Sequence, residues 1–234
     1  MWKPSLLIIL FIAIISAITI GLDRNVPPQH LPWKQLNPEA PLGFATSSQV
    51  LRMSLSPSDV CMDMARDAKG FDSIPADPRE TGSVCGWEIA RVVYGSEAAA
   101  LRPGEANMQC PLAIGSYMWM REVNTLAAKH LGSELKKIHH VGTYSCRRQN
   151  GNNSGQWSEH AYANAWDITG FELEDGRIIS VLKDWNGKDK ARNKFLHEAR
   201  TKACKIFRVT LSPDYNAAHR DHLHVDMGPS TACR

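Results

Sequence analysis

The sequence predicts an α+β fold: a small antiparallel sheet that carries a metal site, flanked by helices and stapled by disulfides. Three observations lead to this prediction. Segments with strand-like alternation are mixed with longer segments of helical periodicity. Asp175-Gly176 is a two-residue hairpin turn between two apolar runs. Histidine and aspartate side chains fall on or beside the later predicted strands, where a sheet can bring them together.

Composition narrows the class of protein. The chain has 234 residues, which is room for one substantial domain and a short appendage. Its hydrophobic fraction of 43% and charged fraction of 22% are ordinary for a globular protein. A formal charge of +3 and the lack of any Lys/Arg run argue against a nucleic-acid partner. A mildly basic surface is compatible with an anionic polymer such as a bacterial cell wall.

The N-terminus predicts export from the cytoplasm. Lys3 precedes an uncharged run over residues 5–22, and Asp23 follows it. Such a run is just long enough to cross a bilayer as a helix, so we expect residues 1–22 to be an uncleaved signal anchor. A cleaved signal peptide is the alternative, although Ala17-Ile18-Thr19 is a poor cleavage site. Either way the remainder of the chain leaves the cytoplasm.

Residues 23–54 are expected to form a stiff, extended tether, because scattered prolines interrupt a polar stretch with no periodic apolar face. The folded domain is expected to occupy residues 55–234. Its first helix would be capped by Ser56, have Pro57 at its first position and stop at Gly70. The apolar positions of that helix are Val60, Met64 and Ala68.

The next elements follow from periodicity. A strand is predicted over residues 88–94, and a long helix over 111–131 that ends at Gly132. Another strand is predicted over 137–145, and a polar loop over 147–156. The alternating segment 165–173 and its partner 177–182 flank the Asp175-Gly176 turn. Asn193 is expected to cap a helix, and the last strands are placed at 207–211 and 222–227.

The cysteines agree with an oxidising compartment. There are six, spread over the exported part of the chain: Cys61, Cys85, Cys110, Cys146, Cys204 and Cys233. An even count without any CxxC pair favours three disulfides over a cysteine zinc site. Several pairings are possible. Proximity along the chain suggests Cys61 with Cys85 and Cys204 with Cys233.

A metal site is the strongest functional signal in the sequence. His160 and Asp167 are separated by six residues, and Asp221-His222-Leu223-His224 follows much later. In a strand, alternate side chains share a face, so His222 and His224 point the same way. Two imidazoles and a carboxylate suit Zn²⁺, which keeps a fourth position open for water when it is catalytic. Taken alone, an HxH pair is more often a surface feature of an edge strand.

Other histidines are weaker candidates for ligands. His30 lies in the predicted tether, whereas His130 and His197 fall in predicted helices. His139 and His140 are consecutive, so in a strand their rings face opposite ways. His219 is close in sequence to the HxH pair, and its role stays open.

At these residues the chain resembles known proteins. Residues 142–147, 158–170 and 214–226 look like motifs of the bacterial extensin-like C-terminal domain family, with similarity over roughly residues 55–234. Ser158-Glu159-His160 with Asp167, and the Asp221–His224 motif, also resemble the two signatures of the lysostaphin, D-Ala-D-Ala metallopeptidase and hedgehog superfamily. By motif, the chain is similar to penicillin-insensitive murein endopeptidases. The resemblance implies a zinc enzyme that acts on peptidoglycan. Together with the predicted signal anchor, this places the domain in the periplasm, held in the inner membrane by one N-terminal helix.

The resemblance also implies roles for individual residues. His160, Asp167 and His224 would be the zinc ligands, and His222 would stay unligated and assist the reaction. Asp221 stands where the carboxypeptidase branch has a glutamate base, so the identity of the base, Asp221 or His222, stays open. Two further residues would bind substrate: Arg147, which matches an arginine that grips a peptide carboxylate, and Ser158.

Three functions are compatible with these features. The first is an endopeptidase that cuts peptide cross-links or stems in peptidoglycan. The second is a non-catalytic peptidoglycan-binding module that keeps the fold, as hedgehog-like members of the superfamily show. The third is a carboxypeptidase that trims terminal D-Ala.

Overall fold

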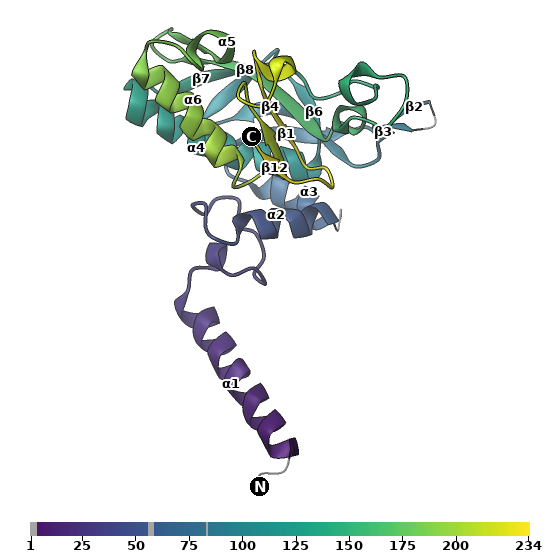
Figure 1. Ribbon diagram of the computed structural model, residues 1–234, viewed down its shortest axis with the longest axis vertical. Helices are drawn as coiled ribbons and strands as arrows, with labels where there is room; N and C mark the ends of the chain where they lie inside the picture. The colour runs from purple at the N-terminus through teal and green to yellow at the C-terminus, as the bar shows by residue number, and fades with distance from the viewer. Residues whose placement is uncertain (1–3, 56–58, 83) are drawn as a thin grey trace.

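The protein is described by a computed structural model over residues 4–55, 59–82 and 84–234 (Figure 1). The predicted helix start at Ser56 and Pro57 lies outside the described residues. A long apolar helix projects from a folded body in which helices cover a twisted sheet. The α-helices are α1 (Pro4–Asn25), α2 (Thr46–Leu55), α3 (Asp59–Asp67), α4 (Cys110–Leu131), α5 (Val181–Asp184) and α6 (Lys190–Ala203).

A ten-stranded sheet forms the centre of the described structure, in the order β1-β4-β5-β7-β8-β11-β10-β12, with β6 paired to β4 and β9 to β8. Most pairs are antiparallel, and only β5 with β7 and β10 with β12 run parallel within this sheet. The α+β class and the flanking helices are confirmed, and the sheet has more strands than predicted. Its strands are β1 (Phe71–Ala76), β4 (Ala90–Ser96), β5 (Ala99–Arg102), β6 (Ala106–Gln109), β7 (Leu135–Gly142), β8 (Ala165–Leu173), β9 (Ile178–Ser180), β10 (Val209–Leu211), β11 (Leu223–Asp226) and β12 (Ala232–Cys233). A separate pair joins β2 (Arg79–Thr81) to β3 (Cys85–Trp87).

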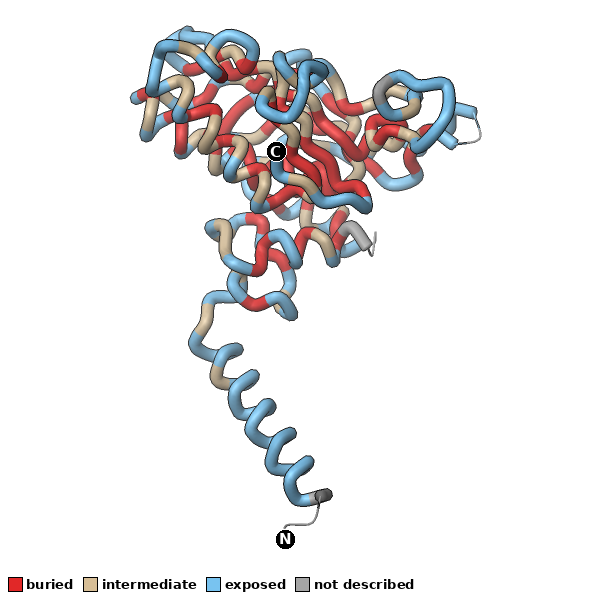
Figure 2. Tube along the Cα trace, in the orientation of Figure 1, coloured by how far each residue is buried: buried red, intermediate tan, exposed pale blue. Residues whose placement is uncertain are grey.

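The predicted long helix is α4, and it is the centre of the core. Trp119, Val123 and Ala127 on α4 are fully buried, and Gly132 ends the helix in the left-handed conformation with φ 70°. The Trp119 ring meets the Trp166 ring of β8 edge to face at 5.7 Å between centroids. Figure 2 shows the buried residues concentrated where α4 and α6 cover the sheet. Burial of these large apolar side chains is the main stabilising contribution to the domain.

Two helix predictions need correction. Val60 was expected on the buried face of the first domain helix, but its side chain is 51% exposed, and Cys61 and Ala65 are buried instead. The cap of α6 is Asp189, not Asn193, because the Asp189 carboxylate accepts hydrogen bonds from the backbone of the first helical turn. Asp is as good a capping residue as Asn, and the helix therefore starts about one turn earlier.

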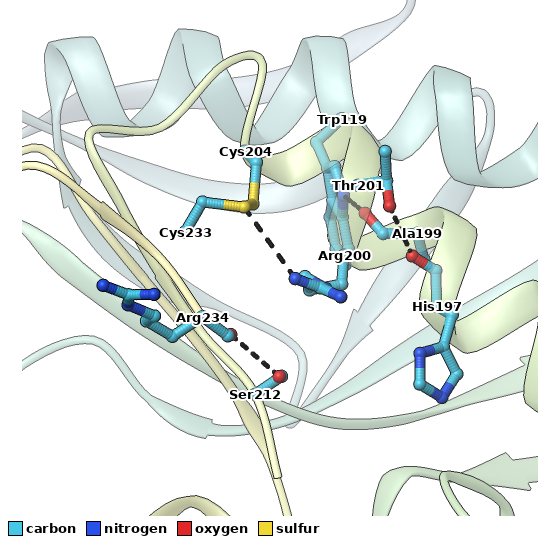
Figure 3. Close-up of a disulfide and its surroundings, with 9 residues drawn as sticks. All are labelled: Trp119, His197, Ala199, Arg200, Thr201, Cys204, Ser212, Cys233 and Arg234. Atoms are coloured by element: carbon cyan, nitrogen blue, oxygen red, sulfur yellow. Dashed lines mark hydrogen bonds between the residues drawn. A yellow bond between two sulfur atoms is a disulfide. The ribbon is translucent and has the colours of Figure 1, made fainter. Parts of the chain in front are cut away.

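Three disulfides join Cys61 to Cys110, Cys85 to Cys146 and Cys204 to Cys233. The Cys204–Cys233 prediction is confirmed (Figure 3), and it ties β12 to the end of α6. The predicted Cys61–Cys85 pair is wrong. Proximity in sequence does not decide pairing, because α3 packs on α4 and so brings Cys61 to Cys110.

The segment predicted to be an extended tether is folded. Residues 28–30 form the short helix η1 (Pro28–His30), and α2 follows at Thr46–Leu55. Leu31, Val50 and Met53 are buried, and Val50 and Met53 belong to the main apolar core of the domain, a long-range contact that the proline pattern concealed. Before it, α1 is long and apolar enough to cross a membrane, with a mean hydropathy of 2.6 over its most apolar window, a property that signal sequences share.

Candidate metal centre

Two neighbouring strands carry the first part of the site. β11 pairs antiparallel with β8, and the register places His224 directly opposite Asp167. Because side chains alternate along a strand, the neighbours of Asp167, Trp166 and Ile168, point into the core and the carboxylate points away from it. The two predicted ligands therefore meet on the same face of the sheet, 57 residues apart in sequence.

His160 enters from a separate element. It lies in η3 (Glu159–Tyr162), a short 3₁₀ helix whose N-cap is Ser158: the Ser158 hydroxyl accepts a hydrogen bond from the His160 backbone at 3.3 Å. The His160 side chain is buried, and its Nδ1 lies 3.3 Å from the carbonyl oxygen of Thr143. A carbonyl only accepts, so Nδ1 carries the proton and the lone pair of Nε2 is directed at Asp167.

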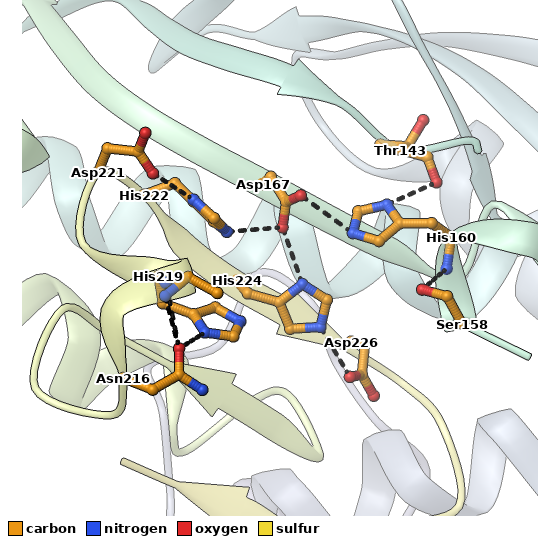
Figure 4. Close-up of polar contacts among 11 residues, drawn as sticks. Thr143, Ser158, His160, Asp167, Asn216, His219, Asp221, His222, His224 and Asp226 are labelled. Carbon is orange, nitrogen blue, oxygen red and sulfur yellow. Dashed lines mark hydrogen bonds and ion pairs between the residues drawn. The ribbon is translucent and has the colours of Figure 1, made fainter. Parts of the chain in front are cut away.

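The three predicted ligands converge (Figure 4). One ligand atom from each of His160, Asp167 and His224 lies within 4.8 Å of the others. His224 Nδ1 is 2.8 Å from Asp167 Oδ1, and His160 Nε2 is 3.1 Å from Asp167 Oδ2. The second contact is close but not aligned as a hydrogen bond, so His160 Nε2 is buried without a hydrogen-bond partner. A buried ring nitrogen without a hydrogen-bond partner is expected where the lone pair of that nitrogen binds a cation.

Asp226 contacts the nitrogen of His224 that points away from Asp167, and the sequence assigned Asp226 no defined role. Its Oδ2 lies 3.0 Å from His224 Nε2, and its Oδ1 accepts the backbone N–H of Gly228 at 2.8 Å. With Nε2 held by Asp226, Nδ1 is the nitrogen of His224 that points at Asp167 and would bind a cation after giving up its proton. Carboxylates and carbonyls that fix the tautomer of a histidine ligand are typical of metal sites. The only sequence signal for this residue was its place on the same strand face as the HxH pair.

The carboxylate of Asp167 and the imidazoles around it shift one another's pKa. Burial alone raises the pKa of Asp167, but the nearby nitrogens of His160 and His224 outweigh it and hold that pKa well below its ordinary value. Burial disfavours a charged His224 ring, but hydrogen bonds to Asp167 and Asp226 outweigh burial and raise its pKa to about 9. The metal-free cluster therefore holds a proton near neutral pH, and a cation that binds there displaces it.

The next pair, Asp221 and His222, forms a dyad at the edge of the cluster. Asp221 Oδ1 lies 2.9 Å from His222 Nδ1, and His222 Nε2 faces Asp167 Oδ1 at 3.6 Å. The hydrogen bond from His222 lowers the pKa of Asp221, which stays ionised. Figure 4 shows the Asp221 carboxylate on the outer side of the His222 ring, away from His160 and His224.

A fourth histidine, His219, lies beside His222 and His224. Its ring centroid is 5.2 Å from that of His222 and 5.8 Å from that of His224. Asn216 Oδ1 accepts two backbone hydrogen bonds at the start of η4 (Ala217–His219) and also contacts His219 Nδ1 at 2.8 Å, so Nδ1 must be the donor. Burial and the neighbouring His222 lower the His219 pKa to about 4, so the ring is neutral with its Nε2 lone pair free to accept. Only proximity in sequence had marked this residue.

These residues lie in a cleft of about 960 Å³. One wall is the polar loop after β7, with Arg147 and Trp157, and another is formed by β10 and β12. Arg147 is exposed in this wall, whereas its neighbour Arg148 stacks over the Trp157 ring at 4.5 Å. Ser158 also lines the cleft, although it is 6% exposed and its hydroxyl caps η3.

Fold and site together define a class: a disulfide-bonded α+β domain with a sheet-borne His/Asp/His cluster in a cleft, preceded by an apolar helix. The chain belongs to the family described as extensin-like protein C-terminus, whose model matches residues 59–234. The match begins at α3 and includes all of the cluster. No curated protein and no solved structure matches the chain.

Proposed function

We propose that this protein is a zinc-dependent peptidoglycan hydrolase of the periplasm, an endopeptidase that cuts peptide cross-links or stem peptides. The observation that carries the proposal is the convergence of three candidate ligands, two of which are histidines whose outer nitrogens are fixed by other groups. The inner nitrogens of His160 and His224 and the carboxylate of Asp167 face one another. The outer nitrogens of both rings are held by Thr143 and Asp226.

The donor set fits zinc by its chemistry. Two neutral imidazoles and one carboxylate are the ligand types of catalytic zinc sites, which leave a position open for water. Bound there, Zn²⁺ would supply a water of lowered pKa and polarise a scissile carbonyl. The motif resemblance to the lysostaphin and D-Ala-D-Ala metallopeptidase superfamily supports the same assignment.

His222 is the better candidate for proton transfer than Asp221. Asp221 accepts the Nδ1 proton of His222, so the Nε2 lone pair of His222 faces the cluster and can take a proton from an attacking water. The same atom can then return the proton to the leaving amine. Asp221 acts by orienting the ring and by stabilising its charged form.

His219 is neutral and can contribute to substrate binding, because its ring lies beside those of His222 and His224. With Nδ1 bonded to Asn216, its Nε2 can accept a hydrogen bond from a substrate amide. Arg147, in the cleft wall, would pair with a free carboxylate of a stem peptide and set the register of the substrate. Such carboxylates occur along peptidoglycan stems, so the cleft can bind the middle of a stem as well as its end. This favours an endopeptidase over a carboxypeptidase.

Export of the domain agrees with this substrate. The α1 helix is apolar enough to cross a membrane, and three disulfides require an oxidising compartment. We therefore place the cleft in the periplasm, with α1 in the inner membrane.

The test is digestion of purified peptidoglycan by the full chain in detergent, with mass spectrometry of the released muropeptides. We expect products that disappear with a chelator and return with zinc. His222→Gln should abolish release but keep zinc and wall binding, whereas Arg200→Gln, on α6 away from the cluster, should behave as wild type. If the fully zinc-loaded protein binds peptidoglycan and releases nothing, the chain is a binding module.

A further inference from the structure

Residues 26–55, here called the collar, form a folded unit between α1 and the domain. The side-chain amide of Gln49 donates to the carbonyl oxygens of Pro28 and Leu31, both at 2.9 Å. The backbone N–H of Ala45 donates to Gln29 O at 3.0 Å. Gly43 packs so closely on Gln29 that a Cβ there would lie 2.2 Å from the Gln29 oxygen. The collar is therefore compact.

The collar is joined firmly to the domain. Arg121 of α4 donates to Pro38 O at 2.9 Å, and the Glu39 carboxylate accepts the backbone N–H of Lys69 at 2.9 Å. Leu36, Val50 and Met53 belong to the same apolar core as α4. Figure 2 shows buried segments running from the collar into the domain. Movement of the collar therefore moves the whole domain.

The collar is equally joined to the end of α1. Asp23 accepts a hydrogen bond from Trp33 Nε1 at 3.1 Å and pairs with Lys34 Nζ at 2.7 Å. The uncharged run of residues 5–22 would span about 27 Å as a helix, close to the thickness of the hydrocarbon core. With α1 across a bilayer, Asp23 would lie at headgroup level, and Trp33, which is hydrogen-bonded to Asp23 and 45% exposed, would lie at the same depth.

A second aromatic side chain lies nearby. Phe44 is 89% exposed, and its backbone N–H donates to His30 Nδ1 at 3.1 Å. That bond places Phe44 beside η1, which begins three residues after α1 ends. Transfer of the Phe44 ring from water to an apolar or interfacial surface would be favourable.

We propose that the collar docks on the periplasmic surface of the membrane, with Trp33 and Phe44 inserted among the phospholipid headgroups. This rests on α1 as a membrane span, but not on the zinc chemistry. Aromatic side chains favour this depth, and Arg24 and Arg52 favour anionic lipids. Arg52 belongs to the same surface, since it donates to Trp33 O at 3.2 Å. In Figure 1 the yellow turn that contains η4 lies at the end of the domain opposite α1, so a docked collar keeps this edge of the cleft away from the bilayer.

The test uses the full chain in vesicles of phosphatidylethanolamine and phosphatidylglycerol whose acyl chains are brominated near the headgroup. Bromine quenches tryptophan fluorescence only at short range. Trp33→Phe should lower the quenched fraction of the emission, because it removes a quenched emitter. Trp157→Phe, in the cleft, should raise that fraction slightly, because it removes an unquenched one. Trp2 is present in both variants and cancels in the comparison.

Phe44→Trp provides an independent measurement, since this exposed side chain can change without disturbing the fold. It should raise the quenched fraction, also in the Trp33→Phe background. Vesicle flotation tests membrane anchoring by α1 separately from docking of the collar. If the protein floats but Trp33→Phe and Phe44→Trp both leave quenching unchanged, docking is wrong and the anchor stands. If the protein does not float, the anchor and the docking both fail, while muropeptide release still tests the enzyme.

Discussion

Asp226 is not one of the three candidate ligands, but it fixes which nitrogen of His224 faces them. Its carboxylate accepts the Nε2 proton of His224, and this keeps Nδ1, the nitrogen that points at Asp167, as the one that can bind a cation. Thr143 does the same for His160 through a backbone carbonyl. Two histidines with fixed tautomers bind a cation more tightly than two that must reorient, because less ordering is left to the binding step.

Asp226→Asn should weaken zinc binding by about 10–100-fold, the usual effect of losing such a partner. Asp226 accepts two hydrogen bonds, whereas Asn has one amide oxygen. If that oxygen accepts from Gly228, the NH2 group faces His224 Nε2 and favours the tautomer that blocks Nδ1; if it accepts from His224, the NH2 group opposes the Gly228 N–H. Zinc affinity is measured by competition with a chelating dye, which requires no activity. Asp214→Asn is the matched control, because Asp214 accepts a hydrogen bond from Trp185 and does not bond to the cluster. Equal affinity of Asp226→Asn and wild type would contradict the assignment.

His140 is a buried titratable residue outside the cluster. Its ring is 5% exposed on β7, and Nε2 donates to Pro103 O at 3.0 Å. Burial lowers the pKa of His140 below 6.5, with the bond to Pro103 opposing. As pH falls through about 6.5, the unfolded chain takes up a proton that the folded chain resists, so the free energy of unfolding decreases. The loss levels off below the folded pKa.

We therefore expect the wild type to lose more stability than His140→Gln between about pH 7 and pH 5, since Gln does not titrate and can still donate to Pro103. Urea unfolding of the two proteins at a series of pH values, with chelator present, gives the difference in slope. Parallel curves would show that His140 charges as easily in the folded state as in water.

At the scale of elements, the Cys85–Cys146 disulfide positions one wall of the cleft. It joins β3 to the segment after β7, directly before Arg147. Tyr144 also packs edge to face on Trp87 of β3, with 5.1 Å between centroids, and the Ser145 backbone donates to His160 O at 2.9 Å. The wall that carries Arg147 is thus fastened to β3 on one side and to the metal cluster on the other.

Replacing both Cys85 and Cys146 with Ser should cost about 2–4 kcal/mol of stability and increase hydrogen exchange in the loop of residues 147–156. Mass spectrometry of peptides from that loop measures the change. The control removes Cys204 and Cys233 in the same way, which costs a disulfide but leaves the loop fastened. If hydrogen exchange in residues 147–156 is the same in both double variants, the Cys85–Cys146 disulfide does not order this wall of the cleft.

At the scale of the whole molecule, the cluster joins segments that only the folded chain brings together. His160 comes from η3, Asp167 from β8 and His224 from β11. A cation held by all three binds the folded state far better than the unfolded chain, so it stabilises the domain by mass action.

Zinc should therefore raise the thermal unfolding midpoint of the full chain in detergent. Free zinc at 100 times its dissociation constant would contribute about 2.7 kcal/mol, which is several degrees for a chain of this size. Scanning fluorimetry with zinc and with chelator measures the shift. A variant with His160→Ala and His224→Ala should not respond to zinc, and a wild-type protein that also fails to respond has no site of this kind.

The sequence by itself determined the features that depend on neighbouring residues. The strand at Ala165–Leu173, the long apolar α4 and the apolar N-terminal helix follow from local periodicity, and the candidate ligands follow from motif spacing. Only the tertiary structure decided what depends on distant segments. The pairing of β8 with β11 put Asp167 opposite His224, and the packing of α3 on α4 chose Cys110 for Cys61. The collar likewise folds because its few apolar residues reach the core of α4, a long-range contact that no local pattern encodes.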